Sequence, residues 1–110
     1  MSYKVQLAQT AKDDLQDIFS YIAFRIPELN SLQNAKYQIM RIEHAMQSLN
    51  EFPNRYPIAS YGRLHENNVR IMPIDNYLMH YIVDDNTYVV HIVRILSNRR
   101  NIAAEKRTFE

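Results

Sequence analysis

The chain lacks cysteine altogether, since none of its 110 residues is Cys. This absence excludes a disulfide framework, a thiol nucleophile and a zinc site built from thiolates, and it fits a reducing compartment. Apolar runs long enough to cross a bilayer are also missing, and the opening MSYKVQL has no signal-peptide pattern. We therefore predict a soluble, cytoplasmic protein that has no membrane partner.

Glycine is almost as scarce, because Gly62 is the only one in the chain. Phosphate loops of the GxGxxG or GxxxxGK type need several glycines, so a nucleotide held in that way is excluded. Asp13, Asp14 and Asp17 resemble a small metal cluster, but they lie beside a predicted helix start, where the helix dipole favours carboxylates. We expect no cofactor and no metal site.

Charge is nearly balanced overall but unevenly distributed along the chain. The net charge is +1, and residues 1–93 hold eight Lys or Arg against ten Asp or Glu. Residues 94–110 hold two glutamates against five basic residues, which are Arg94, Arg99, Arg100, Lys106 and Arg107. This basic end suits nucleic acid or an acidic partner, although a solvated terminal helix has the same composition.

Two amphipathic helices are predicted after a short first strand at residues 2–7. Thr10 and Asp13 match a capping box, which predicts a helix start at that point. Asn30 or Ser31 begins a second helix with a long apolar stripe. Two helices joined by a short loop form an αα-hairpin, and its apolar stripe can cover one face of a sheet.

Residues 69–100 contain three strand-like runs separated by turn signals at 74–76 and 84–86. Their alternation of apolar and polar residues predicts a half-buried sheet with one covered and one open face. A three-residue second turn places one alternate set in the core, namely Tyr77, Met79, Tyr81, Val83, Val89, His91, Val93 and Ile95. We expect His91, the only strongly polar member, to be a satisfied core or rim histidine.

The open face should carry His80 and Arg94, because neither suits a core. The turn at 74–76 decides the position of Arg70. A two-residue turn places Arg70 on the covered face, whereas a three-residue turn pairs it with His80. We prefer the three-residue turn, since it also places two apolar neighbours of Arg70 in the core. Arg70, His80 and Arg94 then share the open face.

The elements together predict an α+β fold with the order β-α-α-β-β-β, in a single domain of residues 1–110. The length suits one compact core. We expect an antiparallel sheet covered on one face by the helical hairpin, and a basic C-terminal tail or short helix.

This order and four motifs resemble the RelE/ParE superfamily of bacterial type II toxin–antitoxin toxins. The motifs are YKVQLAQTAKDDLQDIFSYIA, SLNEFPNRYP, VRIMPIDNYLMHYIVDD and VVHIVRILSNRRN. The resemblance implies a toxin that arrests growth and is masked by the C-terminal segment of a cognate antitoxin, with operator DNA contacted only through that antitoxin. The implied binding residues on the open face and tail are Arg70, His80, Arg94, Arg99 and Arg100.

The superfamily divides by target, and the motifs favour the ParE-like branch, which resembles inhibitors of DNA gyrase. RelE-like members resemble ribosome-dependent mRNA endonucleases and place an arginine after the tyrosine of the second hairpin strand. Here Leu78 follows Tyr77, and residues 101–104 lack the aromatic residue that often ends RelE-like chains. The Arg99-Arg100 pair fits the ParE-like outline.

A metal-independent endoribonuclease acting on ribosome-bound mRNA is the alternative. Arg70 and Arg94 could hold a phosphate, and His80 could act as acid or base near neutral pH. Glu51 or Glu66 could supply a carboxylate. The arginines could instead bind an antitoxin or a target surface without chemistry, and the chain could be a family member that binds its antitoxin but no longer arrests growth.

Overall fold

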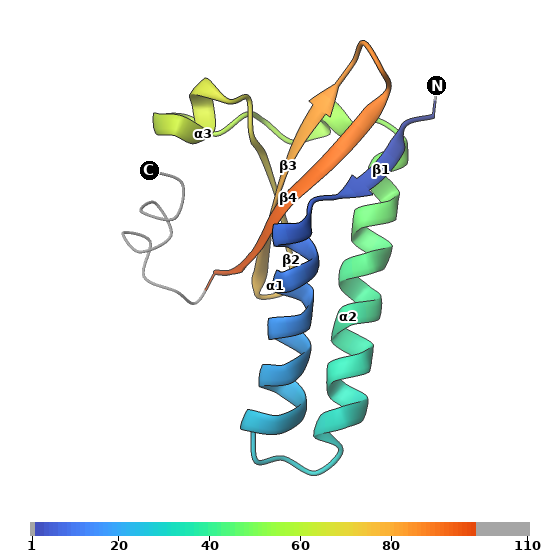
Figure 1. Ribbon diagram of the computed structural model, residues 1–110, viewed down its shortest axis with the longest axis vertical. Coiled ribbons are helices and arrows are strands. Elements are labelled where there is room, and N and C mark those ends of the chain that lie inside the picture. The colour runs from blue at the N-terminus through green and yellow to red at the C-terminus, as the bar shows by residue number, and fades with distance from the viewer. Residues whose placement is uncertain (1, 99–110) are drawn as a thin grey trace.

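The computed structural model describes residues 2–98 (Figure 1). Its helices and strands are β1 Lys4–Leu7, α1 Gln9–Ser20, a π-helical turn Tyr21–Arg25, α2 Ser31–Gln47, α3 Gly62–Glu66, β2 Arg70–Ile74, β3 Tyr77–Asp84 and β4 Val89–Ser97. Short 3-10 turns occupy Ser48–Asn50 and Pro53–Arg55. The predicted α+β fold is thereby confirmed, while the predicted basic tail with Arg99 and Arg100 lies outside the described residues. No helix in residues 2–98 is long and apolar enough to span a membrane.

The four strands form one mixed sheet in the order β1-β4-β3-β2. β1 runs parallel to β4, whereas the other two pairs are antiparallel, so the expectation of a wholly antiparallel sheet is wrong for β1. The helical hairpin explains this orientation because it returns the chain to the start of β1, where the Tyr3 amide donates to the Asn50 carbonyl at 2.7 Å. β2 therefore runs in the same direction as β1. The chain then reverses twice, at the β2–β3 and β3–β4 turns, so β4 is parallel to β1 as well.

One face of the sheet is covered by α1 and α2, which lie side by side against it (Figure 1). The core between helices and sheet consists of apolar side chains that alternate along the strands and recur on the helix faces. Its buried members are Ala11, Ile42, Met46, Leu49, Met72, Met79, Tyr81, Val90, Ile92 and Ile95. The hairpin thus buries the face that the sequence predicted, although several of the residues on that face differ.

A bulge in β4 decides which of its side chains reach this core. Tyr81 pairs with Ile92 but its neighbour His80 pairs with Arg94, so Val93 is an extra residue on β4. An extra residue reverses the alternation of a strand. Ile92 before the bulge and Ile95 after it therefore both face the helices.

The predicted alternation of β4 is accordingly wrong before the bulge and correct after it. Val89, His91 and Val93 were expected in the core, yet Val90 and Ile92 are the residues buried there. The loop between β3 and β4 has four residues, 85–88, in place of the predicted three. Because the register after the bulge regains the predicted parity, His80 and Arg94 do share a face, as expected.

The turn between β2 and β3 is also tighter than predicted. Ile74 pairs with Tyr77 across a two-residue turn, so Arg70 pairs with Tyr81 and not with His80. Asp75 takes a left-handed φ of 52°, which aspartate tolerates better than most residues. Contacts from α2 hold this conformation, because the Asp75 carboxylate accepts hydrogen bonds from Gln38 and Arg41.

Candidate functional site

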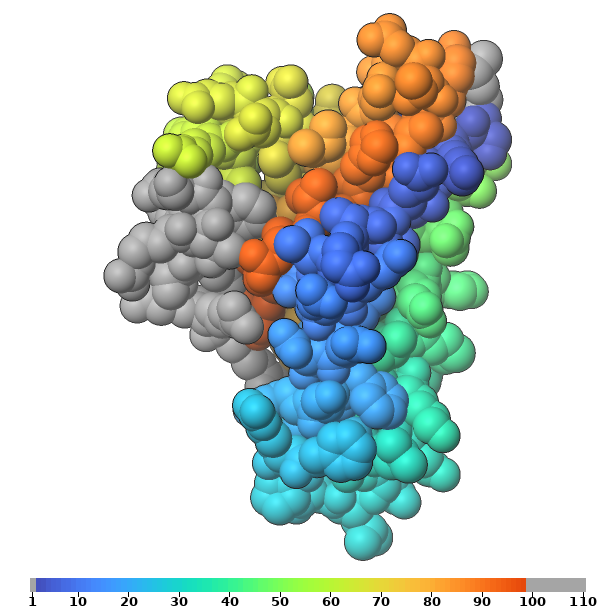
Figure 2. All heavy atoms as spheres, in the orientation of Figure 1, coloured from blue at the N-terminus to red at the C-terminus, as the bar shows by residue number. Residues whose placement is uncertain are grey.

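The sheet face away from α1 and α2, here called the distal face, is defined by cross-strand pairs that point to the same side. Its members include Ile71, Pro73, Leu78, His80, Ile82, His91, Arg94 and Leu96. Of these, His80 and Leu96 are buried, Pro73 is exposed and the other five are partly exposed. Figure 2 shows the side chains of β4 between the start of α1 and the segment that holds α3. These residues make the distal face largely apolar, with two imidazoles and one guanidinium.

His80 is a buried, neutral member of this face. Its Nδ1 lies 3.2 Å from the carbonyl oxygen of Leu78, and only 3% of the residue is exposed. Burial lowers the pKa of His80 to about 4. The imidazole is therefore uncharged at neutral pH and does not add to the positive charge of Arg94.

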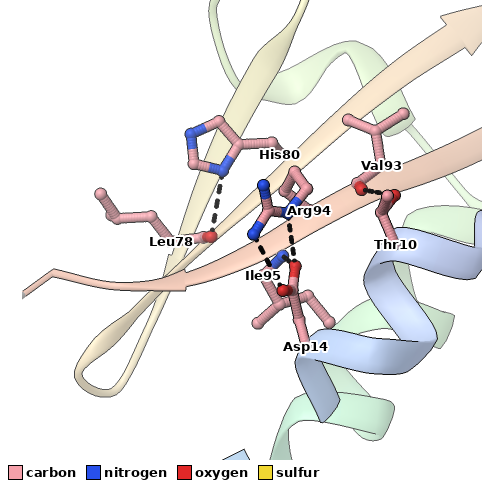
Figure 3. A network of polar contacts seen from close by, with 7 residues as sticks. All are labelled: Thr10, Asp14, Leu78, His80, Val93, Arg94 and Ile95. Carbon is pink, nitrogen blue, oxygen red and sulfur yellow. Dashed lines mark hydrogen bonds and ion pairs between the residues drawn. The ribbon is translucent and has the colours of Figure 1, made fainter. Parts of the chain in front are cut away.

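Arg94 is held from below by α1 (Figure 3). Its Nε and Nη2 donate to the two carboxylate oxygens of Asp14 at 2.8 and 3.0 Å. The same carboxylate accepts the backbone N–H of Ile95 at 2.8 Å. The hydrogen bonds from the Arg94 guanidinium to Asp14 raise the pKa of Arg94, so its charge is permanent. The predicted pairing of His80 and Arg94 on one face is present, with Asp14 as a third member that the sequence did not suggest.

Arg70, the third predicted member, points elsewhere. It shares the helix-covered side with Tyr81, and its Nη1 donates to the carbonyl oxygens of Tyr56 at 2.5 Å and Asn54 at 3.3 Å. The Tyr81 hydroxyl donates to the neighbouring Pro53 carbonyl at 2.7 Å. The predicted cluster of Arg70, His80 and Arg94 is thus wrong for Arg70, because the two-residue turn shifts β2 by one position. Arg70 fastens the loop of residues 53–56 to the sheet.

The remaining predicted residues lie apart from this pair. Glu51 follows α2 and Glu66 ends α3, and both residues are exposed. Arg99 and Arg100 fall outside residues 2–98. Of the predicted site, the described structure therefore brings together only His80 and Arg94.

A groove of about 700 Å³ lies at the end of the sheet that holds the β2–β3 turn, and the sequence did not predict it. Its walls include Asp17 from α1, Arg25 from the π-helical turn, Gln38 from α2 and Asn76 from the β2–β3 turn. The groove arises because the helical hairpin extends beyond the sheet at this end (Figure 1). The lengths of the elements could have indicated this overhang. A helix of 17 residues spans about 26 Å, whereas a strand of five residues spans about 17 Å.

Solved structures of toxin–antitoxin complexes share this architecture. The chromosomal ParDE system of P. aeruginosa matches with a TM-score of 0.67 and 16% identity, over 87% of this chain and 96% of that one. The RelBE2 complex of Mycobacterium tuberculosis gives 0.58 and 21% identity, over 88% and 99%. The archaeal RelE–RelB complex of Pyrococcus horikoshii OT3 gives 0.59 and 16% identity, over 92% and 100%. The fold is that of a RelE/ParE-type toxin.

The sequence narrows this class further. Residues 5–102 match the family described as the ParE toxin of the type II toxin–antitoxin system parDE. The chain belongs to this family of toxins, as its four motifs suggested. No curated protein matches the chain.

Proposed function

We propose that this toxin arrests growth by binding DNA gyrase in the cytoplasm, and that a cognate antitoxin neutralises it by covering the distal face. Membership of the ParE family supports the gyrase target, and the likeness to structures of toxin–antitoxin complexes supports the antitoxin. In this proposal the toxin reaches operator DNA only through the antitoxin.

The observation that carries the proposal is the chemistry of the distal face. Most of its side chains are apolar. Leu78 occupies the position at which the RelE-like branch commonly has an arginine. Arg94 already shares its charge with Asp14, and His80 is neutral at pH 7. A surface of this kind suits protein binding better than phosphate chemistry, which needs several groups that can stabilise charge and move protons.

The target is tested by a supercoiling assay with purified toxin and purified gyrase. We expect the toxin to block supercoiling, and a large excess of toxin that leaves supercoiling intact would rule out the gyrase proposal. The variant Leu78→Asp places a charge on the distal face and should relieve the block if gyrase binds there. Gln47→Asp, on the exposed side of α2, is a control that adds a charge elsewhere.

The antitoxin is tested with the protein encoded by a short reading frame beside the toxin gene. We expect coexpression of that protein to restore growth and to give a stable complex with the toxin. Leu78→Asp and Ile82→Asp should weaken the complex, whereas Gln47→Asp should not. Failure of both distal-face variants to alter binding would place the antitoxin on another surface.

A ribosome-dependent mRNA endonuclease is the second candidate, and the adjacent His80 and Arg94 favour it. Such an enzyme would cleave mRNA on programmed ribosomes, and His80→Ala and Arg94→Ala would reduce the cleavage. We expect no cleavage above that seen without toxin. Cleavage that depends on both residues would replace the gyrase proposal with this one.

A further inference from the structure

The first two turns of α1 take over from β1 as the edge partner of β4. β1 ends opposite Ile92, where the Ala8 amide donates to the Ile92 carbonyl at 2.9 Å. Beyond that point the Thr10 hydroxyl donates to the Val93 carbonyl at 2.7 Å, and the Ile95 amide donates to Asp14. Thr10 and Asp14 are four residues apart, so they lie on the same face of α1. Through them, α1 contacts β4 at the bulge residue Val93 and after it.

Asp14 also fixes the orientation of Arg94, which directly follows the bulge residue Val93. The carboxylate binds the edge of the guanidinium formed by Nε and Nη2. The opposite end, with Nη1 and the second N–H of Nη2, points away from Asp14 toward the His80 side of β3 (Figure 3). A guanidinium held in this way presents two donors in a fixed geometry that matches a carboxylate or phosphate.

The surroundings distinguish between these two oxyanions. Most of the described side chains on the distal face are apolar, and His80 beside Arg94 is neutral. A nucleic-acid site gathers several cations, because phosphate binding depends on their combined charge. Among the strand residues that the structure describes on this face, Arg94 is the one guanidinium. A preoriented guanidinium in a mostly apolar surface suits one carboxylate of a protein partner.

We propose that Asp14 is a positioning residue that orients Arg94 toward an aspartate or glutamate of the antitoxin. This proposal rests on the proposed function, in which the antitoxin covers the distal face. Asp14 itself does not touch the antitoxin. It lowers the ordering cost of the contact by holding the bulge and the guanidinium in the bound geometry before binding.

Asp14→Asn tests the proposal, because it removes the charge but keeps the shape and one acceptor oxygen. Asp75→Asn is the matched control, since Asp75 binds Nε and Nη2 of Arg41 in the same way on another part of the sheet. We expect Asp14→Asn to weaken binding of the adjacently encoded antitoxin about tenfold, the usual scale for a charged hydrogen bond. Asp75→Asn should leave this affinity unchanged.

Two readouts separate positioning from a general loss of stability. The Nε–Hε signal of Arg94 in nitrogen-15 spectra should be resolved and slow to exchange in the free toxin, lost in Asp14→Asn and retained in Asp75→Asn. In the Arg94→Gln background, Asp14→Asn should cause no further loss of affinity, because the two residues act through one contact. Substitution of each Asp and Glu of the antitoxin in turn should identify one carboxylate whose removal weakens binding to the parent toxin. Its removal should cause no further loss of affinity for Arg94→Gln.

Several outcomes would overturn the proposal. One is an unchanged affinity of folded Asp14→Asn or Arg94→Gln while Leu78→Asp still weakens the complex, and this would leave the proposed antitoxin surface intact. Another is a loss of antitoxin affinity from Asp14→Asn that is as large in the Arg94→Gln background as in the parent toxin. If Asp14→Asn does not fold, Arg94→Gln and the antitoxin variants still decide the matter. Tighter binding of an RNA oligonucleotide than of the antitoxin, lost in Arg94→Gln, would assign the guanidinium to phosphate instead.

Discussion

Two carboxylate–guanidinium pairs of the same geometry fasten the two helices to opposite parts of the sheet. Asp14 on α1 binds Nε and Nη2 of Arg94 on β4 at 2.8 and 3.0 Å. Asp75 in the β2–β3 turn binds Nε and Nη2 of Arg41 on α2 at 2.7 and 2.9 Å. The distances alone would rank the two pairs as equals.

Their surroundings differ, and the surroundings decide what each pair contributes. The Asp14 and Arg94 side chains are 11% and 23% exposed, against 28% and 43% for Asp75 and Arg41. Asp14 also satisfies a buried backbone amide, whereas the third partner of Asp75 is the side chain of Gln38. Water can replace the partners of an exposed charge but not those of a buried one. The inner pair should therefore matter for folding and the outer pair mainly for the shape of a turn.

Removal of each carboxylate should give the largest difference between the two pairs. Asp14→Ala leaves a part-buried guanidinium and the Ile95 amide without partners, so it should lower the free energy of unfolding by about 3 kcal/mol. Asp75→Ala should cost only a small fraction of that value, because solvent screens the Arg41 charge. Urea denaturation of both variants and the parent measures the difference. Equal losses would show that burial does not separate the pairs.

The pH dependence of stability should also distinguish His80, beside the inner pair, from Asp75 in the outer pair. The pKa of His80 falls to about 4 on folding, so stability is complete above the unfolded pKa of about 6.5 and is lost as the pH falls toward 4. We expect a loss of about 2 kcal/mol across this window. Hydrogen bonds from Arg41 and then Gln38 lower the pKa of Asp75, so its contribution is lost only at still lower pH.

The measurement is denaturant unfolding at a series of pH values with His80→Gln as the comparison. This variant cannot titrate and should show a flatter profile between pH 6.5 and pH 4. Asp75→Asn should keep the slope of the parent in that range. A His80→Gln profile as steep as that of the parent would assign the loss to another group.

Two tyrosine hydroxyls repeat the contrast between inner and outer contacts. The Tyr81 ring is fully buried and its hydroxyl donates to the Pro53 carbonyl at 2.7 Å, while the Tyr3 hydroxyl donates to the exposed Asp85 at 2.6 Å. Tyr81→Phe should cost about 1 kcal/mol, because the carbonyl of Pro53 loses its partner. Tyr3→Phe should have a smaller effect on thermal unfolding. A larger loss from Tyr3→Phe than from Tyr81→Phe would mean that water binds the Pro53 carbonyl once the Tyr81 hydroxyl is removed.

Most of the fold could be predicted from the sequence because it depends on regular periodicity. The helical stripes and alternating strands identified the element order and the covered face, including Met79 and Tyr81. The family resemblance, carried by motifs along the whole chain, agrees with the match over residues 5–102. Patterns of this kind survive small errors in turn length, since they average over many residues.

The site was harder to predict because it depends on single-residue events. One extra residue at Val93 reverses half of β4, and one fewer residue in the turn at Asp75 moves Arg70 to the other face. Both events are stabilised by long-range contacts from the helices, which local sequence does not encode. Asp14 was assigned to the helix dipole for the same reason, since its partners lie 80 and 81 positions away.

Thr10 gives the smallest expected effect and separates the two accounts of how α1 begins. The sequence predicted a capping box of Thr10 and Asp13, but α1 begins at Gln9 and the Thr10 hydroxyl donates to Val93 across to β4. Thr10→Val should therefore cost about 0.5 kcal/mol through the β4 bulge, while Asp13→Ala should be nearly neutral. A capping box would make both substitutions costly, because each side chain then satisfies an orphan amide. Thermal unfolding of the two variants decides between these accounts, and a cost confined to Thr10 would show that the helix start supports the sheet edge beside Arg94.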